Sequence, residues 1–329
     1  MRQRRAFARA SWVPTLALAC AGACGGGGGA KAPTYTPVSA TTDGTLSTLQ
    51  LGDLKMVVDE SRGGRITEFS LFGTNTLVTR DQNGTYGSTY WPSPQSSWCA
   101  AGGACWPPPA ALDSGTYAAD PINASNNISL TSGPTPLDTV AGSALVLNKT
   151  FVPLPESGAI NVVYQLSNSS TSATVSLAPW QISRVATNGL TFFGQGAGPV
   201  TYTSDSDPTF AVTEGAGDLW YASAPVTHDS KAFADGAGWL AQATPDRLLS
   251  LVSWTDVMPA QIAPGEAEIE VFTIGDYVEI EAQGALTSLA PGQGLTWAVQ
   301  WKLRPIPAGA SVAAGSADLA ALATTTLAE

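Results

Sequence analysis

The stretch from Asp276 to Leu303 constrains the fold more than any other part of the chain. Hydrophobic and polar residues alternate along it in two runs, one on each side of a Pro291-Gly292 turn. Strict alternation with a period of two is typical of β-strands that have one buried face. The predicted buried face consists of Val278, Ile280, Ala282, Trp297, Val299, Trp301 and Leu303. The stretch therefore predicts two strands joined by a turn, with glutamates on the opposite face of the first strand.

A second turn, at Gly275-Asp276, comes directly before this stretch. As a two-residue hairpin loop it places Glu270 opposite Glu281, and two carboxylates opposite each other on one face of a sheet repel. Such a pair persists where a cation lies between the carboxylates, where one has a raised pKa, or where water screens them. Lys302 and Arg304 on the following strand are candidates for the cation. The alternative is a solvated acidic face, which antiparallel sheets commonly expose.

The first 24 residues have the features of an export signal. Four arginines are followed by a short hydrophobic run, Trp12 to Ala19, which is too short to span a bilayer. Small residues then lead to Cys20 and Cys24, and both sites resemble the lipobox of a bacterial lipoprotein. We expect a signal peptide over residues 1–24 and a flexible Gly/Pro/Thr linker over residues 25–45. The protein would then be exported to the periplasm or outer cell envelope and meet the membrane only through a lipid anchor. Sec and twin-arginine export both stay open.

Two further cysteines, Cys99 and Cys105, flank a short loop that contains two glycines. In an oxidising compartment this spacing favours a local disulfide. A zinc site would need more Cys or His ligands, and His228 is the one histidine in the sequence. We therefore expect a disulfide, no metal and no cofactor.

The charge of the chain excludes some partners. The formal net charge is −11, and it becomes −15 without residues 1–24. So acidic a chain offers no basic patch for nucleic acid. Charged residues make up 12% of the sequence, and ten tryptophans stand among many Gly, Pro, Ser and Thr. This composition indicates an exported, β-rich protein that faces glycans.

Residues 46–305 read as one all-β domain, either a sandwich or two closely packed sheets, because short β-type runs alternate with turn residues throughout. The clearest predicted strands, besides those already described, are 54–59, 65–71, 144–152, 159–167, 174–182, 238–243 and 248–254. The tail, residues 306–329, has one candidate short helix at Ala317 to Ala323.

A long loop from Tyr86 to Pro109 is rich in aromatic residues and proline. Long loops in compact domains are usually functional, and aromatic rings stack on the C–H faces of sugars. Trp91, Trp98 and Trp106 are therefore candidates for sugar binding, with Gln95 as a donor to hydroxyls. The alternative is that the three tryptophans close one end of the sandwich.

Two more candidates stand outside this loop. Arg184 ends a predicted strand, where it would face an acidic sugar or one of the glutamates; the alternative is a plain surface charge. His228 is the side chain best suited to proton transfer near neutral pH, although a lone histidine beside an aspartate is often a surface residue.

Several motifs together resemble the galactose mutarotase-like superfamily, and more closely a bacterial mutarotase-like family of unknown function. They are Gly63-Gly64-Arg65-Ile66, Gly87 to Gln95, Trp106 to Pro109, Pro179-Trp180, Lys231 to Gly236, Gly238 to Ala241 and Tyr277 to Trp301. The resemblance implies an all-β galactose mutarotase-like β-supersandwich with a concave, polar, sugar-binding face.

The resemblance also implies roles for particular residues. Aldose 1-epimerases carry a catalytic glutamate in a Glu-x-Gln element shortly before a Leu-x-Pro-Gly-Glu turn, and Glu281-Ala282-Gln283 precedes Leu289 to Gln293 here. Glu281 would be the base that takes the proton from the anomeric hydroxyl. The family's acid histidine is absent from its usual strand, so His228 or Lys231 would supply the proton. Lys231 and Glu279 are also expected to bind substrate.

The leading hypothesis is an exported carbohydrate-binding protein. If it is an enzyme, we expect an aldose 1-epimerase-like isomerase in which Glu281 is the general base. The first alternative is a non-catalytic glycan-binding surface lipoprotein or structural module. A polysaccharide lyase is the third, because related folds host that chemistry.

Overall fold

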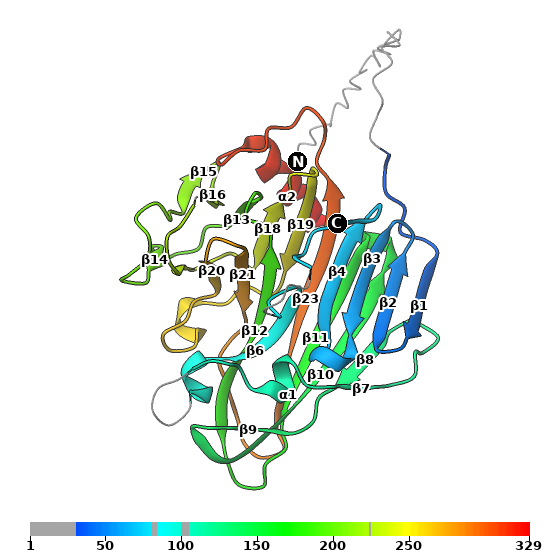
Figure 1. Cartoon of the computed structure of the whole chain (residues 1–329), viewed down its shortest axis with the longest axis vertical. Coiled ribbons are helices and arrows are strands. Elements are labelled where there is room, and N and C mark those ends of the chain that lie inside the picture. Colours follow the sequence, from blue (N-terminus) through cyan, green and yellow to red (C-terminus); the bar gives the residue numbers. More distant parts are fainter. Residues whose placement is uncertain (1–30, 80–83, 100–104, 224) are drawn as a thin grey trace, which may run out of the picture. The chain divides into compact units, whose positions relative to one another are not determined.

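Two antiparallel β-sheets make up the protein from Ala32 to Glu329 (Figure 1). The computed structural model describes residues 31–79, 84–99, 105–223 and 225–329. The predicted signal peptide, with Cys20 and Cys24, lies outside the described residues, as does the predicted linker up to residue 30. No helix in the described part of the chain is both long and apolar enough to span a membrane. The prediction of an all-β sandwich is confirmed.

The first sheet, sheet A, carries the candidate site. Its strands, in spatial order, are β1 (Val38–Asp43), β2 (Leu46–Leu51), β3 (Leu54–Asp59), β4 (Arg65–Leu71), β6 (Ser88–Ser93), β12 (Val175–Val185), β21 (Val278–Gln283), β20 (Ile269–Thr273), β17 (Ser230–Ala234) and β14 (Thr201–Tyr202), with β5 (Thr74–Asn75) beside β4 and β22 (Thr287–Leu289) beside β12.

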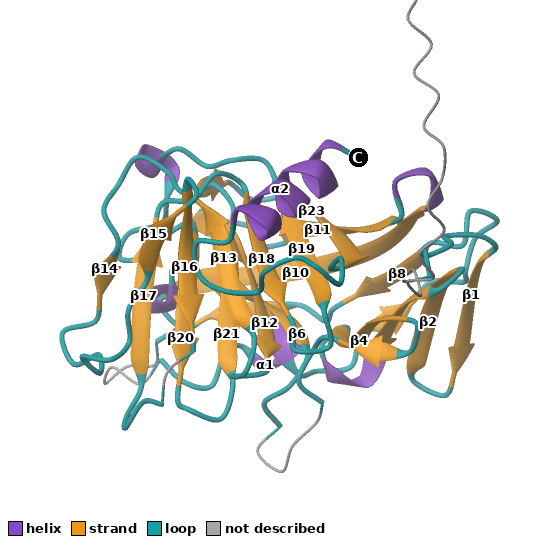
Figure 2. Ribbon diagram, turned by 90° about the horizontal axis from the view of Figure 1, so that it is seen from above, coloured by secondary structure: helices purple, strands orange, loops and turns teal. Residues whose placement is uncertain are grey.

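The second sheet, sheet B, lies behind it. Its order is β15 (Thr213–Gly215), β16 (Asp218–Ala222), β13 (Leu190–Gly194), β18 (Trp239–Ala243), β19 (Leu248–Ser253), β23 (Gly294–Pro305), β11 (Ala159–Asn168), β10 (Val140–Leu154), β8 (Ile128–Thr131) and β7 (Ala118–Ala119), with β9 (Thr135–Leu137) beside β10. The two α-helices among the described residues are α1 (Ala110–Asp113) and α2 (Ala317–Ala328), and α2 covers sheet B (Figure 2).

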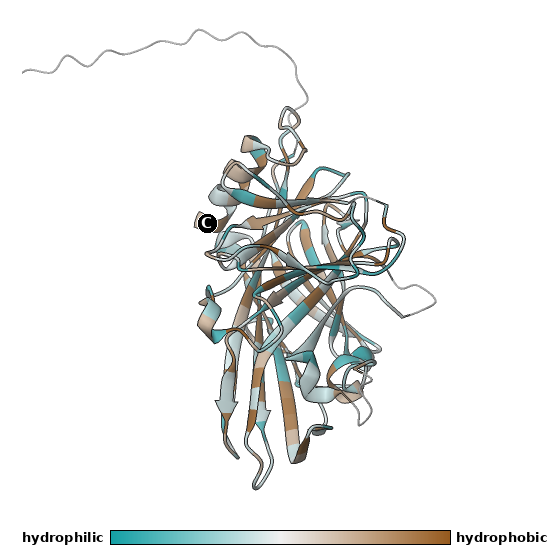
Figure 3. Ribbon diagram, turned by 90° about the vertical axis from the view of Figure 1, so that its left-hand side faces the viewer, coloured by the Kyte–Doolittle hydropathy of each residue, from teal (hydrophilic) through white to brown (hydrophobic). Residues whose placement is uncertain are grey.

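Aromatic side chains join the two sheets across the main core. The ring of Phe69 on β4 meets Trp301 on β23 edge to face at 5.2 Å, and Tyr90 on β6 lies 5.2 Å from Tyr164 on β11. Gln181 on β12 accepts hydrogen bonds from the Tyr164 hydroxyl and from the Trp301 indole, at 3.0 and 3.2 Å. Figure 3 shows hydrophobic and hydrophilic segments interspersed along the strands, as expected when successive side chains point to opposite faces.

The alternation also defines the outer face of sheet A, the face turned away from sheet B. Since Tyr90 and Gln181 point into the core, their neighbours Trp91 and Trp180 point outward. Strand pairing extends this outer row, because Ile182 lies opposite Glu281. The remaining outer side chains used below are Arg65, Arg184, Lys231, Glu270 and Glu279.

Both alternating runs are strands, β21 and β23, but the Pro291-Gly292 turn does not pair them with each other. β21 belongs to sheet A and β23 to sheet B, and β22 pairs with β12 between them. Residues on both faces of β21 are buried, from Val278 to Gln283. Alternation identifies a strand but not its partner, because two runs can meet across a core as readily as side by side. The other turn is as predicted, since Glu270 pairs with Glu281.

Both predicted domain limits also need correction. β1 lies inside the expected linker and pairs with β2 around a two-residue loop, where Gly44 adopts a φ of 61°. At the other end, α2 extends beyond the predicted helix to Ala328 and buries Leu319 and Ala323 against sheet B. The folded part therefore begins before β2 and includes the tail.

Candidate functional site

Glu270 and Glu281 face each other on the outer face of sheet A, with a cation between them. Both side chains are fully buried. Lys231 on β17 makes an ion pair with Glu270 Oε2 and lies 3.3 Å from Glu281 Oε2. β17 pairs with β20, which brings the Lys231 ammonium to the two carboxylates. The predicted repulsive pair is therefore real, and a cation relieves it.

Neither Lys302 nor Arg304 is that cation. Both belong to β23 in sheet B, where Lys302 Nζ donates to the carbonyl of Thr326 and Arg304 pairs with Glu329. Their strand follows β21 in the sequence but lies in the other sheet, away from the glutamates. The cation is Lys231, which the sequence predicts as a substrate-binding residue or an acid and which forms ion pairs with Glu270 and Glu281.

Electrostatics at this pair depend on burial. Loss of water raises the pKa of Glu281 well above its usual value, Lys231 opposes that rise, and Glu270 and Glu279 add to it. Burial lowers the pKa of Lys231, but Glu281 and Glu270 outweigh this effect and raise it, so the ammonium stays charged. Glu281 Oε1 has no hydrogen-bond partner among the described residues. One cation is thus shared by two carboxyl groups, and Glu281 binds its proton more tightly than an exposed glutamate does.

Arg184 forms a second ion pair beside the first. Its Nε and Nη2 both lie 2.9 Å from Glu279 Oε1, and both side chains are buried. The guanidinium also stands 5.5 Å from the centre of the Trp91 ring. Arg184 is therefore not a plain surface charge. It faces a glutamate on one side and a tryptophan on the other.

Ring contacts connect the Glu270–Glu281 pair to the aromatic loop. Trp106 meets Trp91 at 5.5 Å, Trp91 meets Trp180 at 5.3 Å, and Lys231 Nζ lies 5.0 Å from the Trp180 ring. All of these contacts lie on the outer face of sheet A. Trp106, Trp91, Trp180 and Lys231 thus form one continuous row.

The three predicted tryptophans have different environments. Trp98 is 4% exposed, donates to the carbonyl of Pro92 and meets the ring of Trp91 at 6.3 Å, so its ring is held by packing. Trp91 is equally buried but borders a cavity, and Trp106 is 62% exposed beside it. Of the three, Trp91 and Trp106 line the cavity, and Trp98 does not.

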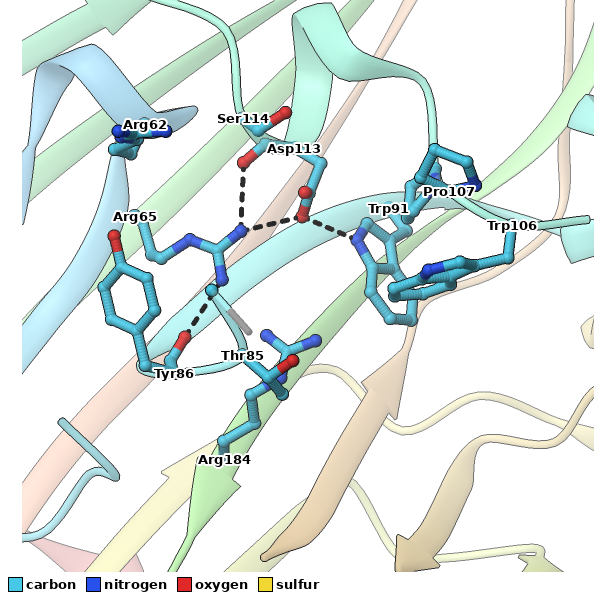
Figure 4. A pocket seen from close by; sticks show the side chains of 12 residues that line it. Arg62, Arg65, Thr85, Tyr86, Trp91, Trp106, Pro107, Asp113, Ser114 and Arg184 are labelled. Atoms are coloured by element: carbon cyan, nitrogen blue, oxygen red, sulfur yellow. Dashed lines mark hydrogen bonds and ion pairs between the residues drawn. The ribbon is translucent and has the colours of Figure 1, made fainter. Parts of the chain in front are cut away.

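A cavity of about 270 Å³ opens between this aromatic pair and the start of β4 (Figure 4). It is lined by Arg62, Arg65, Gly84, Thr85, Tyr86, Trp91, Trp106, Pro107, Pro108, Asp113, Ser114 and Arg184. Ligand pockets begin at about 300 Å³ for drug-sized molecules. This cavity therefore has the size for a ligand as small as one monosaccharide unit.

Asp113, at the end of α1, organises the polar wall of the cavity. Its Oδ1 accepts hydrogen bonds from Trp91 Nε1 at 2.8 Å, Thr89 Oγ1 at 2.9 Å and Arg65 Nη2 at 3.1 Å. Arg65 Nη1 donates to the carbonyl of Tyr86 at 3.0 Å, and Figure 4 shows the bonds of Arg65 and of Trp91 to Asp113. Among the described residues, no side chain or backbone group bonds the second carboxylate oxygen of Asp113, so it is an acceptor for a ligand.

A glycine allows α1 to approach so closely. Gly63 has a φ of 73°, and a Cβ atom there would lie 2.1 Å from the carbonyl oxygen of Asp113. Its amide donates to the carbonyl of Gly115 at 2.6 Å. The Gly63-Gly64-Arg65 motif therefore fixes the position of Asp113 as well as that of Arg65.

Sequence reasoning missed Arg65 and Asp113 as site residues. Arg65 was part of a recognised motif but was given no role. The signal for Asp113 is a carboxylate four residues after the Pro-Pro-Pro run, at the end of a helix that Pro109 begins. Nothing in the sequence alone placed that short helix against β4 and β6.

Gln95 contacts the cysteine loop rather than the cavity. Its side-chain amide donates to the carbonyl of Cys105, and its backbone N–H donates to Glu266 Oε1. The predicted disulfide between Cys99 and Cys105 is confirmed. No group of three or more His, Cys, Asp or Glu side chains in the described chain is arranged to hold a metal ion.

His228 is not brought to the glutamates or to the cavity lining. It is exposed on the loop before β17, where its ring nitrogens bond the Thr227 hydroxyl and the carbonyl of Asp205. Thr227 in turn donates to Asp207. These contacts give His228 a role in holding its own loop.

The site can therefore bind, but it offers little for proton transfer in this state. The cavity presents two indole rings, the carboxylate of Asp113 and the guanidinium of Arg184 to a ligand. Glu281 is fully buried and lies one strand beyond Ile182. A general base must come within hydrogen-bond reach of the proton that it removes.

Comparison with known proteins finds similarity in the fold and not in the sequence. No family model matches this sequence, and no curated protein matches it. Among solved structures, a galactose mutarotase-like protein from Lactobacillus casei is 11% identical, with a TM-score of 0.55 over 79% of this chain and 100% of that one. Another from Clostridium acetobutylicum is 10% identical, with a TM-score of 0.52 over 82% and 98%. As the sequence resemblance predicted, the chain has the galactose mutarotase-like β-sandwich fold.

Proposed function

We propose that this protein binds a carbohydrate in the cavity between Trp91, Trp106 and Asp113. The observation that carries the proposal is the pairing of an exposed indole with a polar wall around one small cavity. Trp106 offers a ring face to the C–H groups of a sugar, while Asp113 and Arg184 offer an acceptor and a donor to its hydroxyls. The fold of the solved mutarotase-like proteins lends support to a sugar as the ligand.

Binding without turnover is the form of this proposal that the geometry supports best. Glu281 and His228 are the predicted base and acid of an aldose 1-epimerase-like isomerase, and they lie apart, one buried and one on a loop. A single observation favours the isomerase as second candidate, namely that Glu281 Oε1 is without a hydrogen-bond partner among the described residues. A buried polar atom without a hydrogen-bond partner calls for an explanation, and a catalytic role is one.

We also propose export to the periplasm or outer envelope, with a lipid anchor at Cys20 or Cys24. The Cys99–Cys105 disulfide supports this location, because disulfides persist in oxidising compartments. Labelling with a radioactive fatty acid in a bacterial host, with Cys20→Ala and Cys24→Ala in separate strains, would identify the lipidated residue.

The test of sugar binding is a glycan-array and monosaccharide screen, followed by calorimetry on each hit. We expect Trp106→Ala to weaken the binding of every hit and Trp98→Ala to affect folding instead. Polarimetry of anomer interconversion with the same sugars, with Glu281→Gln beside the wild type, decides between the two candidates. Acceleration by the wild type that Glu281→Gln abolishes would establish the isomerase. Absence of binding to any sugar would remove both.

A further inference from the structure

The cavity carries a positive charge in an otherwise acidic protein. The chain has a formal net charge of −11. Among the described residues that line this cavity, three are arginines, Arg62, Arg65 and Arg184, and one is a carboxylate, Asp113; Glu279 pairs with Arg184 behind the lining. Figure 4 shows the three guanidinium groups along one side of the space and the two indoles along the other. A neutral sugar would need no such concentration of cations.

Arg184 has a donor that the protein leaves unused. Its side chain is 3% exposed, and its Nε and Nη2 bind Glu279. Nη1 is buried and has no hydrogen-bond partner in the described chain. A buried charged donor without a partner is costly, and native structures seldom keep one without a reason. Arg184 lines the cavity, and a ligand oxygen there would satisfy Nη1 once the atoms that now cover it move aside.

Arg65 shows the same shortage of negative charge. Its Nε is also buried without a partner among the described residues, although Nη1 and Nη2 are both bonded. Burial lowers the pKa of Arg65, Asp113 raises it, and the nearby Arg184 lowers it again. The two guanidinium groups thus repel each other across the wall of the cavity, and an anion between them would relieve that repulsion.

Arg62 adds a third charge at the rim. It is exposed, and no ion pair in the described chain involves it. An unpaired surface cation at the mouth of a cavity attracts anions and raises their local concentration. Its position also makes it replaceable without disturbing the core.

From these observations we propose that the ligand of this cavity is an anionic sugar, one whose carboxylate or phosphate group binds Arg184 Nη1 in the field of Arg65 and Arg62. This inference rests on the proposed carbohydrate binding and names the class of sugar. The indoles would hold the ring and the arginines its charge. Arg–carboxylate and Arg–phosphate contacts share this chemistry.

Calorimetry with matched sugars tests the proposal. D-Glucuronate and D-galacturonate carry the carboxylate, D-glucose 6-phosphate carries the phosphate, and D-glucose and D-galactose are the neutral counterparts. We expect an anionic sugar to bind about 10- to 100-fold more tightly than its neutral counterpart, the value of one charge-assisted hydrogen bond. The preference should narrow as ionic strength rises from about 0.01 M to about 1 M. The anionic sugar that binds more tightly shows whether the site prefers a carboxylate or a phosphate group.

Three variants sharpen the test. Arg184→Lys keeps the ion pair with Glu279 but loses the second donor, so the anionic preference should fall about 10-fold. Arg62→Gln changes an exposed residue at the rim; it should lower the affinity for anionic sugars by about 2- to 5-fold. Lys55→Gln, which removes a cation away from the cavity that pairs with Glu68, is the matched control.

The possible outcomes distinguish a failure of the anionic-sugar inference from a failure of the proposed carbohydrate binding. Equal affinity for neutral and anionic sugars would overturn the inference and leave carbohydrate binding intact, as would a preference that neither arginine variant changes. Inorganic phosphate or acetate that binds as tightly as the charged sugars would show an anion site and refute the carbohydrate function. Failure of every sugar and every anion to bind would refute both.

Discussion

Glu270 and Glu281 lie directly opposite each other on β20 and β21, fully buried, and the ammonium of Lys231 is bonded to both. Each half of this arrangement needs the other. Two opposed carboxylates would repel, and a buried ammonium would lack solvation. The strands β17, β20 and β21 are therefore held at this level of sheet A by charge as well as by their ladder hydrogen bonds.

Removal of this cation should destabilise the protein strongly. Lys231→Met leaves two buried carboxylates without a counter-charge, and loss of one partner from a buried ion pair typically costs about 3–5 kcal/mol. Urea unfolding at pH 7 would measure it. The double variant Lys231→Met/Glu281→Gln removes the repulsion together with the cation, so we expect it to recover more than half of the loss. Equal stability of the single and double variants would contradict the shared-cation arrangement.

The aromatic loop combines a binding residue with a structural one. Trp106→Ala should weaken sugar binding about 10-fold, about 1.4 kcal/mol, and leave the unfolding free energy nearly unchanged, because Trp106 is 62% exposed. Trp98→Ala should cost about 3–5 kcal/mol of stability, because it empties a buried site. Calorimetry and thermal unfolding on both variants separate the two roles. A large loss of stability in Trp106→Ala would show that its ring supports the fold.

Stability should fall as the pH rises from about 4.5 to about 7. Burial raises the pKa of Glu266 to about 7, with Glu270 adding to the rise. Burial likewise raises the pKa of Glu268 to about 7, and Asp256 adds to it. Both groups ionise in the unfolded chain near 4.5, so their contribution is fully present below that pH and is lost as the pH approaches 7.

Thermal unfolding between pH 4.5 and pH 7 would check this dependence. Glu266→Gln keeps an acceptor for the Gln95 amide and should flatten the slope, whereas Glu156→Gln, at an exposed position, should not. The measurement must stop at pH 7, because burial lowers the pKa of Lys149 to about 7. Lys149 contributes stability above its unfolded pKa, and this contribution is lost as the pH falls toward 7. A midpoint temperature that rises between pH 4.5 and pH 7 would refute the assignment.

The sequence predicted strands far better than it predicted their neighbours. The predicted strands 54–59 and 65–71 match β3 and β4 residue for residue. Alternation is a local property, so it survives whatever the strand pairs with. The placement of β21 and β23 in different sheets depends on contacts far apart in the chain, which a one-dimensional pattern does not encode.

The same limit explains what was found and missed at the site. The Glu270–Glu281 pair was predictable because one tight turn fixes the register of a hairpin. Lys231 as its cation was not, because β17 reaches β20 only through the order of strands in the sheet. Asp113 comes from a four-residue helix with no hydrophobic periodicity to mark it.

Truncation at the N-terminus tests whether the folded domain begins before β2. Residues before β2 contribute more than a linker would. β1 forms one edge of sheet A, and the Tyr35 hydroxyl accepts a hydrogen bond from Arg304 Nη1 at 2.8 Å. A chain that starts at Leu46 loses both contacts, and one that starts at Ala32 keeps them. We expect the shorter chain to be less stable by about 1–3 kcal/mol in urea.

The shorter chain should also associate. Without β1, the N–H and C=O groups of β2 become an open sheet edge, which readily pairs with the edge of another copy. β1 itself carries exposed side chains from Thr41 to Asp43, including one acid, which suits an edge exposed to water. Light scattering of both chains at equal concentration would reveal the difference. If the chain from Leu46 stayed monomeric and as stable as the chain from Ala32, residues 31–45 would be a linker after all.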